Sequence, residues 1–191
     1  MNYIIFITRK IFAIILKKLS IETIISSQIH QTFHLCNLAM RNIVIGGMDG
    51  DYFEFGSRKG KSFIIAYKGY TLFRKKYYSN NETPPKKHMR FFAFDAWSKG
   101  LPDDDSVFKP PHWKEGSMSE SKFDFIKNLQ KNKINLDHCV LIEGYFKETL
   151  TKDLIIKHNI EKASVLHFDC DLYESTKESL NFSKQLLQIG T

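Results

Sequence analysis

Residues 51–60 read Asp-Tyr-Phe-Glu-Phe-Gly-Ser-Arg-Lys-Gly, a short β-prone run that stops at Gly56. Aromatic residues in such a run favour a strand, and a glycine directly after it favours a turn. Residues 59–78 follow with apolar side chains recurring at helical spacing. The stretch therefore predicts a strand, a glycine turn and a helix, the first half of a strand–helix–strand unit.

The same alternation continues along the chain. Further strands are predicted over residues 90–94, 139–142 and 163–168, and further helices over residues 119–131, 147–159 and 172–187. Ser119 is the expected N-cap of the first of these helices. Two helical patterns, over residues 3–17 and 20–41, come first. This order predicts an α/β fold with a Rossmann-like, doubly wound, mostly parallel sheet: a helical segment (1–45) precedes one domain (46–191).

Composition places the chain among globular proteins of a reducing compartment. Of its 191 residues 42% are hydrophobic, which is enough for a core without disulfides or a structural metal. The three cysteines are widely spaced and form no CxxC pair, which argues against a disulfide framework or a zinc site. We therefore expect a cytoplasmic protein.

The N-terminus reads MNYIIFITRKIFAIILKKLS, in which basic pairs interrupt each apolar run. The positive charge follows the first apolar run and no small-residue cleavage site is present, so the pattern differs from a signal peptide. The runs are too short to span a bilayer. Two alternatives stay open, a basic helix resting on a membrane surface and a helix packing on the domain.

The formal charge of +7 is unevenly distributed, since Glu82 is the only acid between Arg58 and Arg90. Such asymmetry occurs in nucleic-acid-binding surfaces and also in solvated helix faces. The sequence contains neither an aromatic-plus-basic ribonucleoprotein signature nor a zinc finger. We favour the solvated face and expect no nucleic-acid partner.

Each predicted strand is followed at once by a glycine or an acid. The four strand ends are Phe55, Phe94, Ile142 and Phe168. Ligands of doubly wound sheets bind beyond the carboxyl ends of the strands, so these four positions predict one binding site.

The first two strand ends suit a cationic nucleoside. Gly56 and Gly60 allow close backbone approach to a ligand, and Glu54 suits a cation better than a pyrophosphate. Asp95 can accept hydrogen bonds from ribose hydroxyls, although it lies further from the glycine turn than the usual ~20 residues. Each motif alone also fits an ordinary turn or a surface acid.

The last two strand ends suggest an adenine pocket and a reactive centre. Gly144 leaves room for a ring that Tyr145 could stack on, although this tyrosine also fits a core position. Asp169 and Asp171 are two carboxylates at one strand end, the oxygen ligands that Mg²⁺ prefers, and either could take a proton from an acceptor hydroxyl. The competing interpretation is that Asp171 simply caps the last helix.

Together these residues resemble the macrocin O-methyltransferase family, sugar-modifying enzymes that use S-adenosylmethionine (SAM). The matching stretches are Gly50-Asp-Tyr-Phe-Glu-Phe-Gly56 with Gly60, Phe94-Asp-Ala-Trp97 with Gly100-Leu-Pro102, Gly144-Tyr-Phe146 with Thr149-Leu150, and Phe168-Asp-Cys-Asp-Leu-Tyr-Glu-Ser-Thr176. The last stretch is the most specific, and the likeness extends from Gly50 to the end.

The resemblance implies methyl transfer from SAM, usually with Mg²⁺, to a hydroxyl of a sugar or glycosylated small molecule. By position it assigns cofactor contacts to Glu54, Gly56, Ser57, Gly60, Asp95, Ala96, Trp97, Gly144 and Tyr145. Asp169 and Asp171 become the metal ligands and catalytic carboxylates, and which of them acts as base stays open.

The chain departs from that family after its last helix. Similar proteins continue with a fifth strand and an Asp-Asp-Tyr segment that completes the metal site, whereas this chain reads Ile189-Gly190-Thr191 there. We therefore expect an incomplete sheet and metal site, with a natural truncation, a split gene or a covering partner as alternative explanations. A non-catalytic SAM-binding or interaction module is the competing function.

Overall fold

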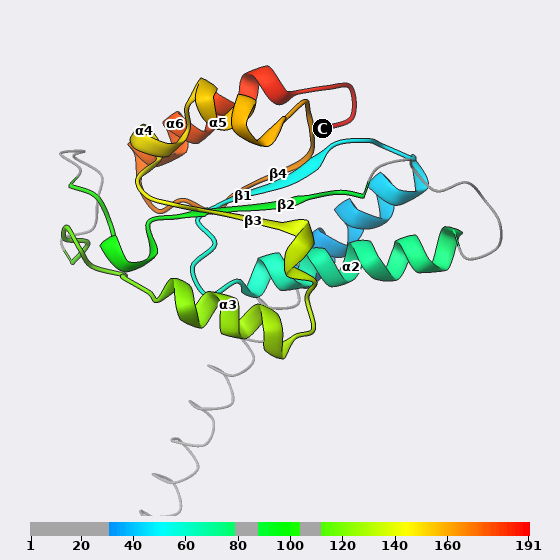
Figure 1. Ribbon diagram of the computed structural model, residues 1–191, viewed down its shortest axis with the longest axis horizontal. Coiled ribbons are helices and arrows are strands. Elements are labelled where there is room, and N and C mark those ends of the chain that lie inside the picture. Colours follow the sequence, from blue (N-terminus) through cyan, green and yellow to red (C-terminus); the bar gives the residue numbers. More distant parts are fainter. Residues whose placement is uncertain (1–30, 79–87, 104–111) are drawn as a thin grey trace, which may run out of the picture.

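A four-stranded parallel sheet forms the centre of the molecule, in a computed structural model that describes residues 31–78, 88–103 and 112–191 (Figure 1). The strand order is β3-β2-β1-β4. All three pairings are parallel, which confirms the predicted α/β class. The strands are β1 (Asp51–Phe55), β2 (Phe91–Asp95), β3 (Cys139–Glu143) and β4 (Ala163–Phe168).

The register brings the carboxyl ends of the strands into line. Phe55, the last residue of β1, lies opposite Phe94 of β2 and Phe168 of β4. Asp95 in turn lies opposite Glu143 of β3. The four strand ends that the sequence singles out therefore form one edge.

Helices cover both faces of the sheet. A helix over residues 31–45 precedes β1, in the region of the second expected N-terminal helix, while residues 3–17 lie outside the described part. The other helices are α2 (Lys61–Tyr78), α3 (Lys122–Lys131), α4 (Phe146–Thr149), α5 (Lys152–His158) and α6 (Tyr173–Ser183), with short 3₁₀ turns at Trp97–Lys99, Leu136–His138 and Lys184–Leu186. Figure 1 shows α2 and α3 on one face and α4, α5 and α6 on the other.

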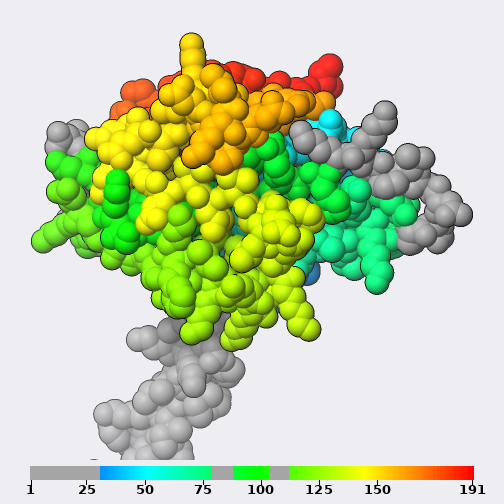
Figure 2. All heavy atoms as spheres, in the orientation of Figure 1, coloured from blue at the N-terminus to red at the C-terminus, as the bar shows by residue number. Residues whose placement is uncertain are grey.

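The alternation of side chains along the strands divides the core in two. Tyr52 and Phe91 pack toward helix 31–45, α2 and α3, together with buried residues such as Met40, Phe63 and Phe125. Phe53, Phe55, Phe92 and Phe94 pack toward the other helices, against Phe146, Leu154 and Phe182. In Figure 2 the yellow and orange atoms of the α4 and α5 side lie above the green atoms of α3, in the same order as in Figure 1.

Two helix boundaries differ from the sequence prediction. Helix α3 begins at Lys122, and Ser121 rather than Ser119 is its N-cap, since Ser121 Oγ accepts the Asp124 N–H at 3.3 Å. The single helix expected over 147–159 is two helices, because the Thr151 hydroxyl caps a new first turn by accepting the Leu154 N–H at 3.3 Å.

The last helix corrects a third expectation. Helix α6 begins at Tyr173, and its N-cap is Leu172, which makes no side-chain capping bond. Asp171 therefore lies one residue before the cap and does not cap the helix. The Asp171 residue instead lines the cavity described below.

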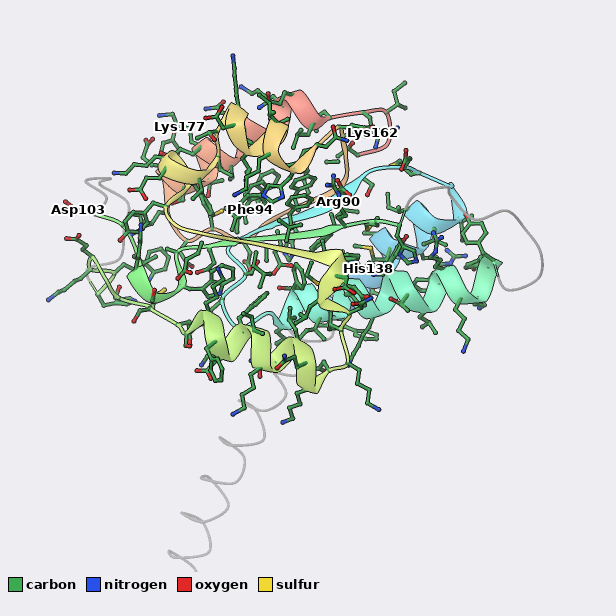
Figure 3. The ribbon with its side chains drawn as sticks, in the orientation of Figure 1. Arg90, Phe94, Asp103, His138, Lys162 and Lys177 are labelled. Atoms are coloured by element: carbon green, nitrogen blue, oxygen red, sulfur yellow. The ribbon has the colours of Figure 1, made fainter. Side chains whose placement is uncertain are left out.

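At the amino ends of the strands, Arg90 joins three segments. Its guanidinium pairs with the buried Asp51 carboxylate, and it also donates to the carbonyl oxygens of His158 and Asn159. Figure 3 shows Arg90 and Phe94 at the two ends of β2. The ion pair fixes the end of α5 to β1 and β2.

The outer side of β4 pairs with no other strand among the described residues. The Ala163 carbonyl at its start instead accepts hydrogen bonds from the side chains of Gln188 (2.9 Å) and Thr191 (2.8 Å). None of the helices in the described ranges combines the length and apolarity needed to cross a bilayer.

Candidate functional site

The turn after β1 lies at the centre of the candidate site because β1 lies between β2 and β4. Gly56 has a φ of +90°, and a Cβ there would lie 2.3 Å from the carbonyl oxygen of Asp169. The Gly56 N–H donates to the Phe94 carbonyl (2.8 Å), and the Asp169 N–H donates to the Phe55 carbonyl (2.9 Å). Only glycine permits this backbone conformation and this close approach together.

Asp95 joins the turn after β1 to the turn after β2. One carboxylate oxygen accepts the Arg58 backbone N–H at 2.7 Å, and the other accepts the Trp97 N–H at 2.6 Å. Burial raises the pKa of Asp95, while these backbone hydrogen bonds act in the opposite direction. The backbone of Ser57 acts in the same direction, and since a carboxylate has about four acceptor positions, capacity remains for a ligand.

A cavity of about 840 Å³ opens beyond this edge of the sheet. Its lining includes seven of the residues that the sequence predicts: Gly56, Asp95, Ala96, Gly144, Tyr145, Asp169 and Asp171. The structure therefore brings residues from all four strand ends to one cavity, whose volume lies in the range of small-molecule and cofactor pockets.

Four predicted residues are not part of the cavity wall. Glu54 is fully buried, and its carboxylate accepts hydrogen bonds from the hydroxyls of Tyr52 and Ser62 and contacts His167 Nδ1 at 3.2 Å. The hydrogen bond to Glu54 raises the pKa of His167, and burial with Glu54 raises that of Tyr52. Glu54 thus has three protein partners and does not line the cavity.

The other three support the turns. Ser57 is buried, and its hydroxyl donates to the Glu54 carbonyl at 3.4 Å. A Cβ on Gly60 would lie 2.7 Å from the Phe125 ring. Trp97 packs on that same ring, and its indole N–H donates to the Arg58 carbonyl at 3.0 Å. These contacts stabilise the turns after β1 and β2, which border the cavity.

The cavity wall is strongly acidic. Its carboxylates are Asp95, Asp103, Asp169, Asp171, Glu174 and Glu178, and its cationic side chains are Arg58 and Lys147. Burial and then the neighbouring Asp169 raise the pKa of Asp171, while Arg58 opposes this. Burial and Glu174 raise the pKa of Glu178. Such a wall favours a ligand with positive charge.

Several wall residues were missed by sequence reasoning. Glu174, Ser175 and Glu178 come from the first turns of α6, and their i, i+1, i+4 spacing on a helix that follows an acidic strand end was an available signal. Arg58 was within the quoted glycine turn. Asp103 and Met118 belong to the long irregular stretch, where no periodicity marks a site; Figure 3 shows Asp103 beyond the carboxyl end of β2.

Asp169 and Asp171 are the carboxylates that could bind a metal ion in this cavity. Within the described ranges, no group of three or more His, Cys, Asp or Glu side chains is arranged to hold one. Mg²⁺ usually keeps several waters and takes one or two carboxylates, so Asp169 and Asp171 could supply at most a minimal site. Among the described residues, these two carboxylates are the donors that would hold such an ion, with water completing its coordination.

Searches of protein-family profiles and of curated proteins gave no match to this chain. Solved structures do match. The crystal structure of CalS11, a calicheamicin methyltransferase, has a TM-score of 0.64 at 22% identity, with 84% of this chain and 62% of that chain covered. The O-methyltransferase NovP has a TM-score of 0.61 at 19% identity, covering 78% of this chain and 57% of that one.

An apo structure of CalS11, described as a TDP-rhamnose 3'-O-methyltransferase, gives a TM-score of 0.55 at 20% identity, covering 84% of this chain and 60% of that one. This chain therefore spans less than two thirds of the length of these neighbours. At such identities the likeness shows the fold, which is a Rossmann-like α/β fold shared with methyltransferases.

Proposed function

We propose that this protein is a SAM-dependent O-methyltransferase that acts on a hydroxyl of a sugar or a glycosylated small molecule. The observation that carries the proposal is the acidic cavity at the aligned carboxyl ends of a sheet with a methyltransferase fold. The description of the CalS11 neighbour as a TDP-rhamnose 3'-O-methyltransferase supports the acceptor class.

The turns after β1 and β2 are the proposed cofactor site. Gly56 lets the ligand approach the backbone, and Asp95 offers its remaining acceptor positions to the ribose hydroxyls. Ala96, Gly144 and Tyr145 would surround the adenine. The excess of carboxylates suits the positive sulfonium and ammonium groups of SAM. In this arrangement Glu54, Ser57, Gly60 and Trp97 position the turns instead of contacting the ligand.

Asp169 and Asp171 are the proposed reactive carboxylates. When bound, SAM supplies an electrophilic methyl group. Asp171, whose pKa is raised by burial and by the neighbouring Asp169, would take the proton of the acceptor hydroxyl as the oxygen bonds to the methyl carbon. The electron pair of the broken carbon–sulfur bond stays on sulfur, which leaves S-adenosylhomocysteine. Asp169 would hold the acceptor, or Mg²⁺ if the ion takes part.

A SAM-binding module without transferase activity is the competing function. The observation that favours it is that the described residues provide two carboxylates and no larger metal-binding group at the reactive end of the cavity. The two functions share the cofactor site and differ in whether a product forms.

The test is formation of S-adenosylhomocysteine from SAM with a panel of sugars, sugar nucleotides and glycosides, in Mg²⁺ and in EDTA. The proposal expects product with at least one acceptor, and a loss of at least about a hundredfold in Asp171→Asn, in line with removal of a general base. The exposed Asp137→Asn is the matched control. SAM binding with no product on any acceptor would support the module, and no SAM binding at millimolar ligand would exclude both functions.

A further inference from the structure

Helix α2 has an outward face that is basic and unbalanced by acids. The helix carries five basic residues and no acidic one. Lys61, Lys68, Leu72 and Lys75 are spaced at i, i+7, i+11 and i+14, so they form one stripe. The stripe lies opposite the buried residues of the helix, such as Phe63 and Tyr70, and it therefore points away from the sheet.

The neighbouring helix 31–45 adds an exposed apolar stripe. Leu35, Leu38 and Ile45 are 64%, 43% and 49% exposed and recur at i, i+3 and i+10, opposite the buried Met40 and Val44. Apolar side chains in a continuous exposed row usually mark an interaction site. Two stripes, one aliphatic and one basic, therefore face outward from one helix layer.

The two helices pack directly against each other. A Cβ on Gly69 of α2 would lie 2.9 Å from Asn37 Oδ1 and 3.6 Å from Met40 Cβ, so the helices cross closely at this glycine. Leu72, which is 60% exposed, lies one turn beyond this glycine and adds an apolar side chain to the basic stripe. At the other side of α2, Lys68 Nζ donates to Asn132 Oδ1 at 2.7 Å, which brings the end of α3 with Lys131 alongside.

The helices on the opposite face of the sheet allow a comparison of charge with α2. Helices α4, α5 and α6 together carry four lysines and four acidic residues. Helix α2, in contrast, carries five basic residues and no acidic residue along its whole length. The charges of α4, α5 and α6 therefore balance, whereas those of α2 leave a net positive charge on the other face of the sheet.

We propose that the outer face of helix 31–45 and α2 docks on an anionic lipid bilayer. Lysines attract anionic headgroups while their aliphatic stems and the leucines between them enter the interface. The transfer of aliphatic side chains from water into a bilayer is favourable, whereas a phosphodiester backbone offers them little apolar contact. The exposed leucines therefore favour a membrane over nucleic acid. The cavity opens at the edge of the sheet, so a docked face leaves its mouth open.

The test is co-sedimentation of the full chain with vesicles of phosphatidylcholine alone and of an equimolar mixture with phosphatidylserine. Wild-type protein is expected to bind the mixed vesicles and to be released by salt. The triple variant Lys61→Glu, Lys68→Glu, Lys75→Glu should bind at least about a hundredfold more weakly, and Leu72→Ser about tenfold more weakly. Since residues 1–30 are identical in all variants, their contribution cancels.

The matched control is Lys152→Glu, Lys157→Glu, Lys184→Glu, which changes the net charge equally on the opposite layer and should bind as wild type. Circular dichroism of each variant verifies that it is folded. Equal loss in both triple variants, or no loss in the α2 triple variant, overturns the proposal. So does binding to duplex DNA or RNA in the absence of binding to mixed vesicles.

Discussion

The backbone N–H of Arg58 donates a 2.7 Å hydrogen bond to the carboxylate of Asp95, which joins the turn after β1 to the turn after β2. Arg58 and Trp97, whose backbone N–H groups both donate to this carboxylate, have positive φ, at 43° and 40°. Non-glycine residues adopt this conformation at a cost of about 1–3 kcal/mol, and such residues cluster at functional sites. A single carboxylate thus stabilises two strained turns that border the cavity.

Replacement of Asp95 by Asn should weaken SAM binding and the fold together. One of the two N–H groups would face an amide NH₂ instead of an acceptor, and an unsatisfied group of this kind costs about 1–3 kcal/mol. We expect SAM affinity to fall at least about tenfold in calorimetry, because about 1.4 kcal/mol corresponds to that factor. Unchanged affinity would show that Asp95 does not contact the ligand. Asp137→Asn serves as the control for loss of an acidic charge.

Gly56→Ala should be far more damaging than Gly47→Ala. Both glycines have positive φ, so alanine is strained at each. At Gly56 a Cβ would also lie 2.3 Å from the Asp169 carbonyl oxygen, whereas nothing lies within 4 Å at Gly47. The comparison separates the close approach of β1 and β4 from backbone strain. Equal losses in thermal midpoint for the two variants would contradict the account of the turn.

Arg90→Ala should destabilise the fold by about 3 kcal/mol, because it leaves the buried Asp51 carboxylate without its cationic partner. Urea-induced unfolding measures the change. Lys177→Ala removes a solvent-exposed ion pair with Glu174 and is the control, for which we expect no measurable effect. A loss at Arg90 no larger than that at Lys177 would refute the assigned role of this ion pair.

Two histidines should make the fold less stable in mild acid. Burial, with help from Arg74 and His138, lowers the pKa of His88, and burial with Lys157 and Arg90 lowers that of His158. The folded chain binds these protons less readily than the unfolded chain. Both histidines therefore favour folding above about pH 6.5, and this stabilisation is lost as the pH falls from there through the lowered pKa values.

The measurement compares unfolding of wild type and of His88→Phe, His158→Phe between neutral pH and about pH 5, the range in which histidine titrates. Phenylalanine keeps a ring at each position but cannot be protonated. The variant should lose less stability on acidification than wild type. The opposite order, or parallel curves, would mean that these two rings do not carry the effect.

The alternation of strands and helices was predictable because each strand is short, rich in aromatic or aliphatic residues and followed by a glycine or an acid. The break at Thr151 was not, since Leu150 continues the helical pattern and only the capping hydroxyl reveals a new helix. Glu54 shows a second limit. Its neighbours Phe53 and Phe55 face one helix layer, so alternation directs Glu54 to the other, and the central position of β1 then buries it.

The residues that line the cavity also divide into those that were predictable from the sequence and those that were not. Residues at strand ends were predictable, because parallel strands that end in line must gather them. Glu178 and Asp103 come from a helix face and an irregular stretch, whose placement depends on tertiary packing. The carboxyl ends of the strands therefore predicted where the cavity lies better than which side chains line it.

Calorimetric titration of the full chain with SAM tests the central claim most directly. The acidic cavity at the four strand ends predicts saturable binding with one-to-one stoichiometry, competition by S-adenosylhomocysteine, and weaker binding in Asp95→Asn. A folded protein that gives no binding heat at millimolar SAM would contradict the claim that this cavity is a SAM site.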